Sequence, residues 1–329
     1  MALFPVTEST LSAVHVGHFL QGKYPLGPMT ECKLFRTGMN HLYMVTDGEA
    51  KYVFRIYNFG WRTKTDISEE VRLLTYLKEH HAPVSYPVAD NLNQIIQELD
   101  APEGKRYGVL FSFAQGNKVP RFTAEQSHPI GQAVGRIHKL TEGFSLDRIT
   151  YDTKVLLVDS MERTTRFFDK PLDEIFFLER MATYLKDQLD NSATSKLRRG
   201  AVHFDVWFDN MHIAQGNEIT IFDFDFCGNG FLCFDVSYFL FQLYSTNQNN
   251  EDYEAKAAAF LSGYESVINI SDEERRILPL ACLAAMTFYL SMQCAKYDTW
   301  SNVFLNDDHL KRFVGSLKRW ITYNKLEIE

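Results

Sequence analysis

Short runs that alternate apolar and polar residues dominate the first third of the chain, a pattern typical of β-strands. The runs lie at 32–36, 42–46, 52–57, 94–97 and 107–113. The dipeptide Asp47-Gly48 separates two of them and predicts a hairpin. A helix is predicted to begin near Asp66, because apolar residues then recur every three or four positions, and to end before Pro83.

From Thr123 onward the apolar residues recur mostly at the helical period. Stripes cover 130–140, 172–192 and 277–294, and Ser271 with Glu274 forms a capping box ahead of the last one. The exception is a short hairpin predicted around the turn 215–217. These patterns predict an α+β chain with a β-rich N-lobe and a mostly α-helical C-lobe.

We place the boundary of the two lobes between residues 113 and 114, giving an N-lobe of 1–113 and a C-lobe of 114–329. A chain of 329 residues is long enough to bury a large hydrophobic core. Hydrophobic residues make up 45% of it and charged residues 23%, which is typical of a soluble globular protein.

The net charge of −8 argues against nucleic acid or an anionic membrane as the main partner. Five scattered cysteines without a C-x-x-C pair argue against a disulfide framework and a zinc site. The N-terminus lacks the features of a signal peptide, and the apolar stretch 231–244 is too short to cross a bilayer. We therefore expect a cytoplasmic protein, while its oligomeric state stays undetermined.

The candidate chemistry lies in His203–Asn210 and in the Asp223 that follows the predicted hairpin. The hairpin places Asn210 at its entrance and Asp223 at its exit, so their oxygens are predicted to meet and to bind Mg²⁺. Asp205 lies just before the hairpin, where a carboxylate can accept or orient the proton of a hydroxyl that attacks ATP. The alternative is that all three are ordinary turn residues.

These motifs resemble those of the aminoglycoside phosphotransferase and choline kinase-like family. Residues 203–210 resemble its H-G-D-x-x-x-x-N, 222–225 its I-D-[WF]-[DE], and 230–236 its G-x-x-x-x-D-[LV]. The resemblance extends over nearly the whole chain and implies a protein-kinase-like two-lobe fold. Phe204 is a departure, because the family usually has Gly there.

The resemblance also implies roles for single residues. It makes Asp205 the catalytic base and places Asn210 and Asp223 on Mg²⁺. Asp225 is implied as an auxiliary metal ligand, and Asp235 as a structural brace of the loop.

In the N-lobe, kinase folds place a cation on a central strand, where it binds phosphates and pairs with a helix Glu. By position that cation is Arg55 and its partner is Glu70, with Glu69 as the near alternative. Gly38 and Asn40 belong to the turn that covers the phosphates in the family. The alternative is that Arg55 is an exposed strand residue that pairs with a neighbouring side chain and binds no phosphate.

Phe113 and Ala114 lie in the predicted connector, where the family reads the adenine edge through backbone groups. Together with the motifs of the C-lobe, they predict a kinase that uses ATP and Mg²⁺ and phosphorylates a hydroxyl.

The acceptor is predicted to be a small molecule, either an amino alcohol such as homoserine or choline or an aminoglycoside-like compound. Residues 224–243 and 297–300 look most like homoserine kinase type II, whereas 52–87 look like the bacterial stress-response kinases that phosphorylate protein Ser/Thr. That protein kinase activity, or a pseudokinase without turnover, is the alternative. Candidate residues for lining the acceptor site are Tyr244, Tyr289, Tyr297, Asp298 and Trp300.

Overall fold

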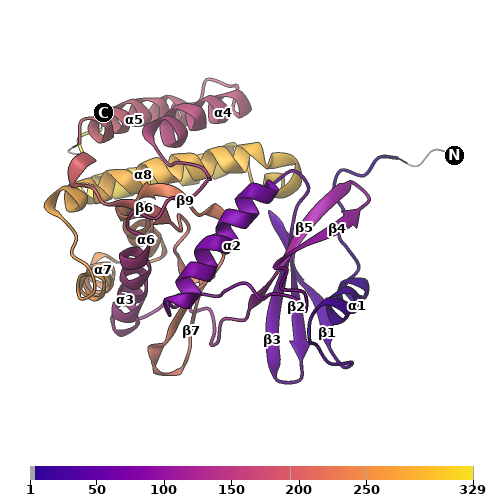
Figure 1. Cartoon of the computed structure of the whole chain (residues 1–329). Helices are drawn as coiled ribbons and strands as arrows, with labels where there is room; N and C mark the ends of the chain where they lie inside the picture. The colour runs from indigo at the N-terminus through magenta and orange to yellow at the C-terminus, as the bar shows by residue number, and fades with distance from the viewer. Residues whose placement is uncertain (1–3, 193, 248, 329) are drawn as a thin grey trace. The chain divides into compact units, whose positions relative to one another are not determined.

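The computed structural model describes residues 4–192, 194–247 and 249–328 and divides into two units, Met1–Gln115 and Gly116–Glu329 (Figure 1). This division lies two residues after the boundary predicted between residues 113 and 114. Unit 1 is built on a β-sheet and unit 2 is mostly helical, which confirms the predicted α+β class.

Unit 1 contains a five-stranded sheet in the order β1-β2-β3-β5-β4, in which every neighbouring pair is antiparallel. The strands are β1 (Glu31–Arg36), β2 (Asn40–Asp47), β3 (Ala50–Tyr57), β4 (Ile96–Ala101) and β5 (Gly104–Ser112). The predicted hairpin joins β2 to β3, with Asp47 opposite Ala50 and Gly48 in the left-handed region at φ 61°.

Two helices pack on unit 1. Helix α1 (Ala13–Lys23), which the sequence analysis did not predict, buries Val16 and Leu20 in a core with side chains of three strands. Helix α2 (Lys64–Glu79) begins just before the predicted start, because Thr63 caps it in a reciprocal capping box with Asp66. The strand alternation of β3 directs Phe54 into the α1 core and leaves Arg55 to reach α2.

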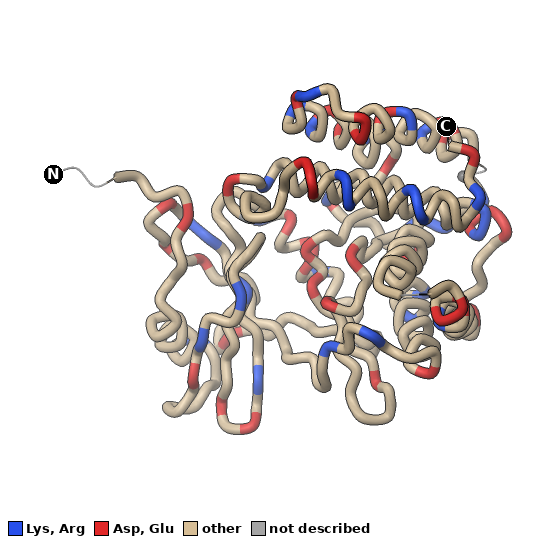
Figure 2. The backbone as a smooth tube through the Cα atoms, turned by 180° about the vertical axis from the view of Figure 1, so that it is seen from behind, with Lys and Arg blue, Asp and Glu red and all other residues tan. Residues whose placement is uncertain are grey.

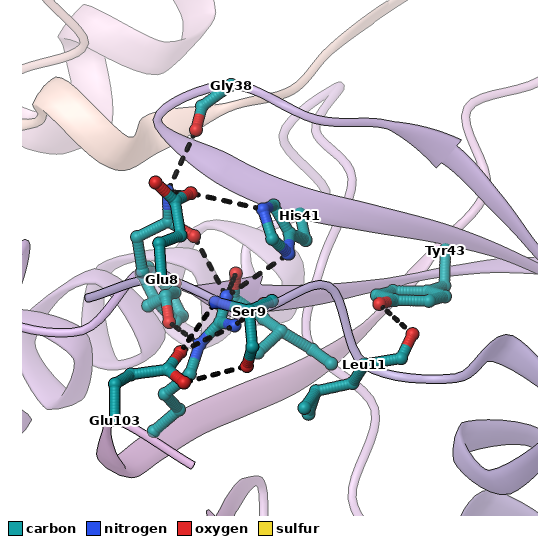
Figure 3. Close-up of polar contacts among 11 residues, drawn as sticks. Glu8, Ser9, Leu11, Gly38, His41, Tyr43 and Glu103 are labelled. Atoms are coloured by element: carbon teal, nitrogen blue, oxygen red, sulfur yellow. Dashed lines mark hydrogen bonds and ion pairs between the residues drawn. The ribbon is translucent and has the colours of Figure 1, made fainter. Parts of the chain in front are cut away.

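A buried polar network ties the N-terminal segment to the sheet of unit 1 (Figure 3). The guanidinium of Arg106 is almost fully buried and donates to the carbonyl oxygens of Tyr57 at 2.9 Å and Ser9 at 2.7 Å. It also lies 3.4 Å from the carboxylate of Glu103, whose side chain is 1% exposed. Ser9 in turn donates its hydroxyl to Glu103 at 2.7 Å. The network satisfies a charge pair that would otherwise be costly to bury.

Unit 2 consists mainly of helices, and charged residues of both signs are interspersed along its backbone (Figure 2). Its α-helices are α3 (Ala124–Thr141), α4 (Asp159–Phe167), α5 (Asp173–Asp190), α6 (Cys233–Thr246), α7 (Asn250–Glu265), α8 (Asp272–Ala295) and α9 (Asp307–Tyr323). A π-helical turn, Lys154–Val158, precedes α4 and another, Tyr297–Ser301, follows α8.

Helix α8 is the core helix of unit 2 and packs against α4, α5 and α6. It begins at the predicted capping box of Ser271 and Glu274. By length and composition it is apolar enough to cross a membrane, but 78% of its most apolar window is buried inside the protein. Its hydrophobicity is therefore accounted for by the core that it forms.

Two short antiparallel strand pairs complete unit 2. Strand β7 (Met211–Ile213) pairs with β8 (Ile219–Ile221), which confirms the predicted hairpin. Strand β6 (Arg199–Val202) pairs with β9 (Gly228–Phe231), a pairing that the sequence analysis missed. The four strands flank the segments 203–210 and 222–227, which carry the candidate chemistry.

We predict that Arg106→Ala destabilises the protein by about 3–5 kcal/mol, because it leaves Glu103 buried without its cation. Urea unfolding of the whole chain measures this loss. Lys105→Ala is the matched control, since Lys105 pairs with Glu98 on the surface and its loss should leave the unfolding midpoint unchanged. Equal midpoints for both variants would contradict a stabilising role of the network.

Candidate active site

The segment that follows β6 is held by the carboxylate of Asp235, in the first turn of α6. Both oxygens accept backbone N–H groups, from His203 at 2.8 Å and from Phe204 at 2.6 Å. One of them also contacts Nε2 of the buried His138 at 3.0 Å. Asp235 is itself 1% exposed, so it acts as an internal anchor, which is the bracing role that the family resemblance implied.

Phe204 adopts the left-handed conformation, with φ 65°, which an L-residue other than Gly rarely does. This conformation costs about 1–2 kcal/mol. The buried ring offsets the cost, because it stacks on Tyr151 with a centroid distance of 3.6 Å and packs edge-on against Phe288. The loop therefore keeps the left-handed turn that Gly would supply, and the departure at this position adds an aromatic anchor.

His203 braces the same loop from its side chain, as predicted. Its Nδ1 accepts the backbone N–H of Asp205 at 3.1 Å, so the proton resides on Nε2, which donates to the carbonyl of Phe222 at 3.0 Å. The imidazole thus ties the loop before β7 to the segment after β8.

The carboxylate of Asp205 accepts one hydrogen bond on each oxygen. Tyr238 donates its hydroxyl to Oδ1 at 2.9 Å, and Asn210 donates its amide nitrogen to Oδ2 at 2.6 Å. Burial raises the pKa of Asp205 to about 6, against the opposing effect of His203 and of these two hydrogen bonds, and the negative charge of Asp223 adds to the rise. The pKa of this carboxyl therefore lies near neutral pH, as efficient catalysis by a general base requires.

The β7–β8 hairpin brings Asn210 opposite Phe222, the residue before Asp223, while the meeting of the Asn210 and Asp223 side chains stays a prediction. Met211 pairs with Ile221, and the N–H of Phe222 donates to the carbonyl of Asn210 at 3.0 Å. Because the amide nitrogen of Asn210 is engaged by Asp205, its oxygen is the atom left for a metal. Asp223 is left-handed at φ 68°, which turns the chain sharply after β8.

Asp225 lies in the 3₁₀ turn Phe224–Phe226 and is buried. Its backbone carbonyl accepts a hydrogen bond from Arg148 at 2.6 Å. An amide oxygen and one or two carboxylates form a donor set that suits Mg²⁺, which takes few protein ligands and keeps water and phosphate oxygens for the rest. The residues present therefore fit the predicted metal.

In unit 1, Arg55 and Glu70 form the predicted ion pair, with Nη1 2.7 Å from Oε1 and both side chains buried. Glu69 pairs instead with Arg72. Tyr57 donates its hydroxyl to the second oxygen of Glu70 at 2.9 Å, and the Arg55 guanidinium lies 4.8 Å from the centroid of the Phe111 ring. The cation is thereby fixed on the sheet.

The other predicted nucleotide contacts lie at the ends of strands in unit 1. The carbonyl of Gly38 accepts from Asn58 at 2.9 Å, and Asn58 also donates to Glu8 (Figure 3). Asn40 begins β2. Phe113, directly after β5, has Lys51 at 5.7 Å from its ring centroid, and Ala114 is buried. Their contact with a nucleotide stays a prediction.

Among the candidate residues for the acceptor site, Tyr289 contacts the catalytic loop, where its hydroxyl donates to the carbonyl of Phe204 at 2.5 Å. Tyr244 packs on Trp320 of α9, and Tyr297 on Phe167 of α4, while Asp298 is exposed. The side chain of Trp300 lies outside the described part of the chain.

Tyr238 was missed by the sequence analysis although it contacts Asp205 directly. A usable signal was its position three residues after Asp235, because residues at this spacing share one face of a helix. The face of α6 that braces the loop is thus also the face that meets the carboxylate.

We predict that Phe204→Gly is more stable than Phe204→Ala by about 1 kcal/mol, because both lose the ring but only Ala retains the left-handed strain. Both variants should be less stable than the natural chain by several kcal/mol, since a buried Phe side chain contributes ~3–5 kcal/mol. Denaturant unfolding of the three proteins measures the order. An Ala variant at least as stable as the Gly variant would show that the backbone is unstrained here.

Comparison with known proteins identifies the family of the chain. The model of the phosphotransferase enzyme family (APH) matches residues 31–268. A homoserine kinase of Methylobacillus glycogenes is 24% identical over 286 residues, which cover 86% of this chain and 85% of that protein.

Two solved structures share the fold. An amicoumacin kinase in complex with AMP-PNP, Ca²⁺ and Ami has a TM-score of 0.74 at 21% identity, and the match covers 94% of both chains. A microcompartment-associated aminopropanol kinase has a TM-score of 0.74 at 17% identity, over 96% of this chain and 100% of that one. These neighbours confirm the protein-kinase-like fold, and the chain belongs to the phosphotransferase enzyme family.

Proposed function

We propose that this phosphotransferase moves the γ-phosphate of ATP to the hydroxyl of a small amino alcohol in a Mg²⁺-dependent reaction. The observation that carries the proposal is the half-buried carboxylate of Asp205, which is hydrogen-bonded on both oxygens. One of its partners, Asn210, lies at the start of the hairpin that leads to Asp223. A fixed carboxylate beside a pair of oxygen ligands is the arrangement that phosphoryl transfer to an alcohol requires.

Asp205 accepts the hydrogen bond of the acceptor hydroxyl and orients its oxygen toward the γ-phosphate. It is held in place by Asn210 and Tyr238, so little reorganisation is needed when the acceptor arrives. Its pKa of about 6 leaves it mostly ionised at neutral pH. The carboxylate can therefore take the proton as the phosphate is transferred.

Asn210 and Asp223 would hold Mg²⁺, with Asp225 as a further oxygen donor. The ion would neutralise the charge of the nucleotide phosphates and fix their orientation. Asn210 would serve both the base and the metal, because its amide nitrogen positions Asp205 while its oxygen remains for Mg²⁺.

Arg55 would contact the α- and β-phosphates from unit 1. Its pairing with Glu70 and its contact with Phe111 keep the guanidinium in one orientation, and its forked donors suit two phosphate oxygens. Gly38 and Asn40 would cover the phosphates through the β1–β2 turn, and Phe113 and Ala114 would offer backbone groups to the adenine.

An amino alcohol is the acceptor that the surroundings of Asp205 favour. Tyr289 stacks on Tyr238 there, with a centroid distance of 5.1 Å, and its ring lies tilted against Phe226 at 5.4 Å. Aromatic rings near a cluster of acidic groups attract an ammonium group through cation–π and charge contacts. The names of the homoserine and aminopropanol kinases, both amino alcohol kinases, point the same way.

A screen for Mg²⁺-dependent ADP release tests this function. Amino alcohols (homoserine, 1-amino-2-propanol, choline), sugars, aminoglycosides and a generic protein substrate are compared. Release stimulated by an amino alcohol is the expected result. Stimulation by aminoglycosides alone would move the acceptor to that class, and stimulation by the protein substrate alone would replace the proposal with a Ser/Thr protein kinase.

We predict that Asp205→Ala lowers turnover with the fastest acceptor by at least about 100-fold, the typical contribution of a general base. Binding of ATP, measured by titration calorimetry, should survive. Asp187→Ala, on the exposed face of α5, is the control and should keep full turnover. Near-normal phosphorylation by the Asp205 variant would rule out its role as the base.

Removal of divalent metal with excess EDTA is predicted to abolish ADP release, and added Mg²⁺ to restore it. Asp223→Asn removes one negative ligand, so the Mg²⁺ concentration for half-maximal rate should rise by at least about tenfold. Asp225→Asn is expected to raise this Mg²⁺ concentration by a smaller factor, because Asp225 is proposed only as an auxiliary ligand. An unchanged Mg²⁺ requirement in Asp223→Asn would exclude that residue as a ligand.

A further inference from the structure

The hydroxyl of Tyr238, on helix α6, lies 2.9 Å from Oδ1 of Asp205. Helix α6 also anchors the catalytic loop through Asp235, and Tyr238 is itself buried, with 4% of the residue exposed. We infer that Tyr238 is a positioning residue, which fixes the orientation of the Asp205 carboxylate so that it presents a free lone pair to the acceptor hydroxyl. The inference rests on the proposed role of Asp205.

Asn210 and Tyr238 hold the Asp205 carboxylate from different elements and bind different oxygens. Asn210 belongs to the loop itself and holds Oδ2, whereas Tyr238 reaches Oδ1 from α6. The carboxylate cannot rotate about its terminal bond without breaking one of these bonds. Because each carboxylate oxygen can accept two hydrogen bonds, both donors leave capacity for the acceptor.

Tyr238 is itself rigid. Its ring stacks on Tyr289 of α8 at 5.1 Å with an interplanar angle of 30°, and Tyr289 donates its hydroxyl to the carbonyl of Phe204. The two tyrosines therefore clamp successive residues of the loop, one on the backbone of Phe204 and one on the side chain of Asp205. Such pre-organisation lowers the cost of reaching the reactive geometry.

The hydroxyl of Tyr238 acts only as a donor in this contact. An ionised carboxylate has no proton to give, and burial raises the pKa of Tyr238 well above its usual value, so the phenol keeps its proton. A Phe at this position would fill the same space in the core. Removing the hydroxyl alone therefore tests the positioning of Asp205 without changing the packing of the core.

The test compares Tyr238→Phe with Tyr253→Phe, a buried tyrosine of α7 that packs with Tyr244, Trp320 and Tyr323. MgATP and the fastest amino alcohol of the screen are the substrates, with homoserine as the first probe. Tyr238→Phe should lower kcat by about tenfold or more, since hydrogen bonds to charged groups are the strong ones. The KM values for ATP and the acceptor should change by less than about twofold, and Tyr253→Phe should match the natural chain.

A double-mutant cycle with Asp205→Asn shows whether Tyr238 acts through the carboxylate. The expected result is that Tyr238→Phe has no further effect on the residual rate of Asp205→Asn. Wild-type kcat in Tyr238→Phe, a rise in KM alone, or the same fold-loss in the Asp205→Asn background would overturn the inference. Full turnover by Asp205→Asn would instead overturn the proposed base, which keeps the two failures distinct.

Discussion

The anchoring of the catalytic loop by Asp235 is the interaction on which the site depends. One buried carboxylate accepts the backbone N–H groups of His203 and Phe204 and contacts His138. Together with the ring contacts of Phe204 and the hydrogen bond from Tyr289, these bonds offset the cost of its left-handed conformation. The orientation of the loop, and with it the direction of Asp205, follows from this anchor.

Around that anchor the site is assembled from elements far apart in the chain. Helix α6 supplies Asp235 and Tyr238, α8 supplies Tyr289, and the β7–β8 hairpin joins Asn210 to the segment of Asp223. Asp205 is held by two partners, Asn210 and Tyr238, that are themselves buried. Rigid support of this kind is what keeps a reactive geometry precise.

Unit 1 also holds buried charged side chains in fixed orientations. Arg55 is fixed by Glu70, and Arg106 is fixed by backbone carbonyls and Glu103. In both cases a cation sits in the interior because its donors are satisfied, so removal of either anion would leave an uncompensated charge. The sheet thereby presents Arg55 in a single orientation, and the Arg106 network holds the N-terminal segment near Gly38 through Glu8 and Asn58 (Figure 3).

Local periodicity and turn chemistry predicted the α+β class, the hairpin between Asn210 and Asp223 and the helix that begins at Ser271. The pairing of Arg55 with a helix Glu was expected from the place of a cation in kinase folds, and the packing of α2 selects Glu70 over Glu69. The pairing of β6 with β9, the docking of α1 and the contact of Tyr238 with Asp205 emerge from the tertiary structure alone. It also separated Tyr289, which meets the loop, from Tyr244, which packs on α9. Such contacts join residues whose separation in the chain carries no local signal, so they depend on how the helices pack.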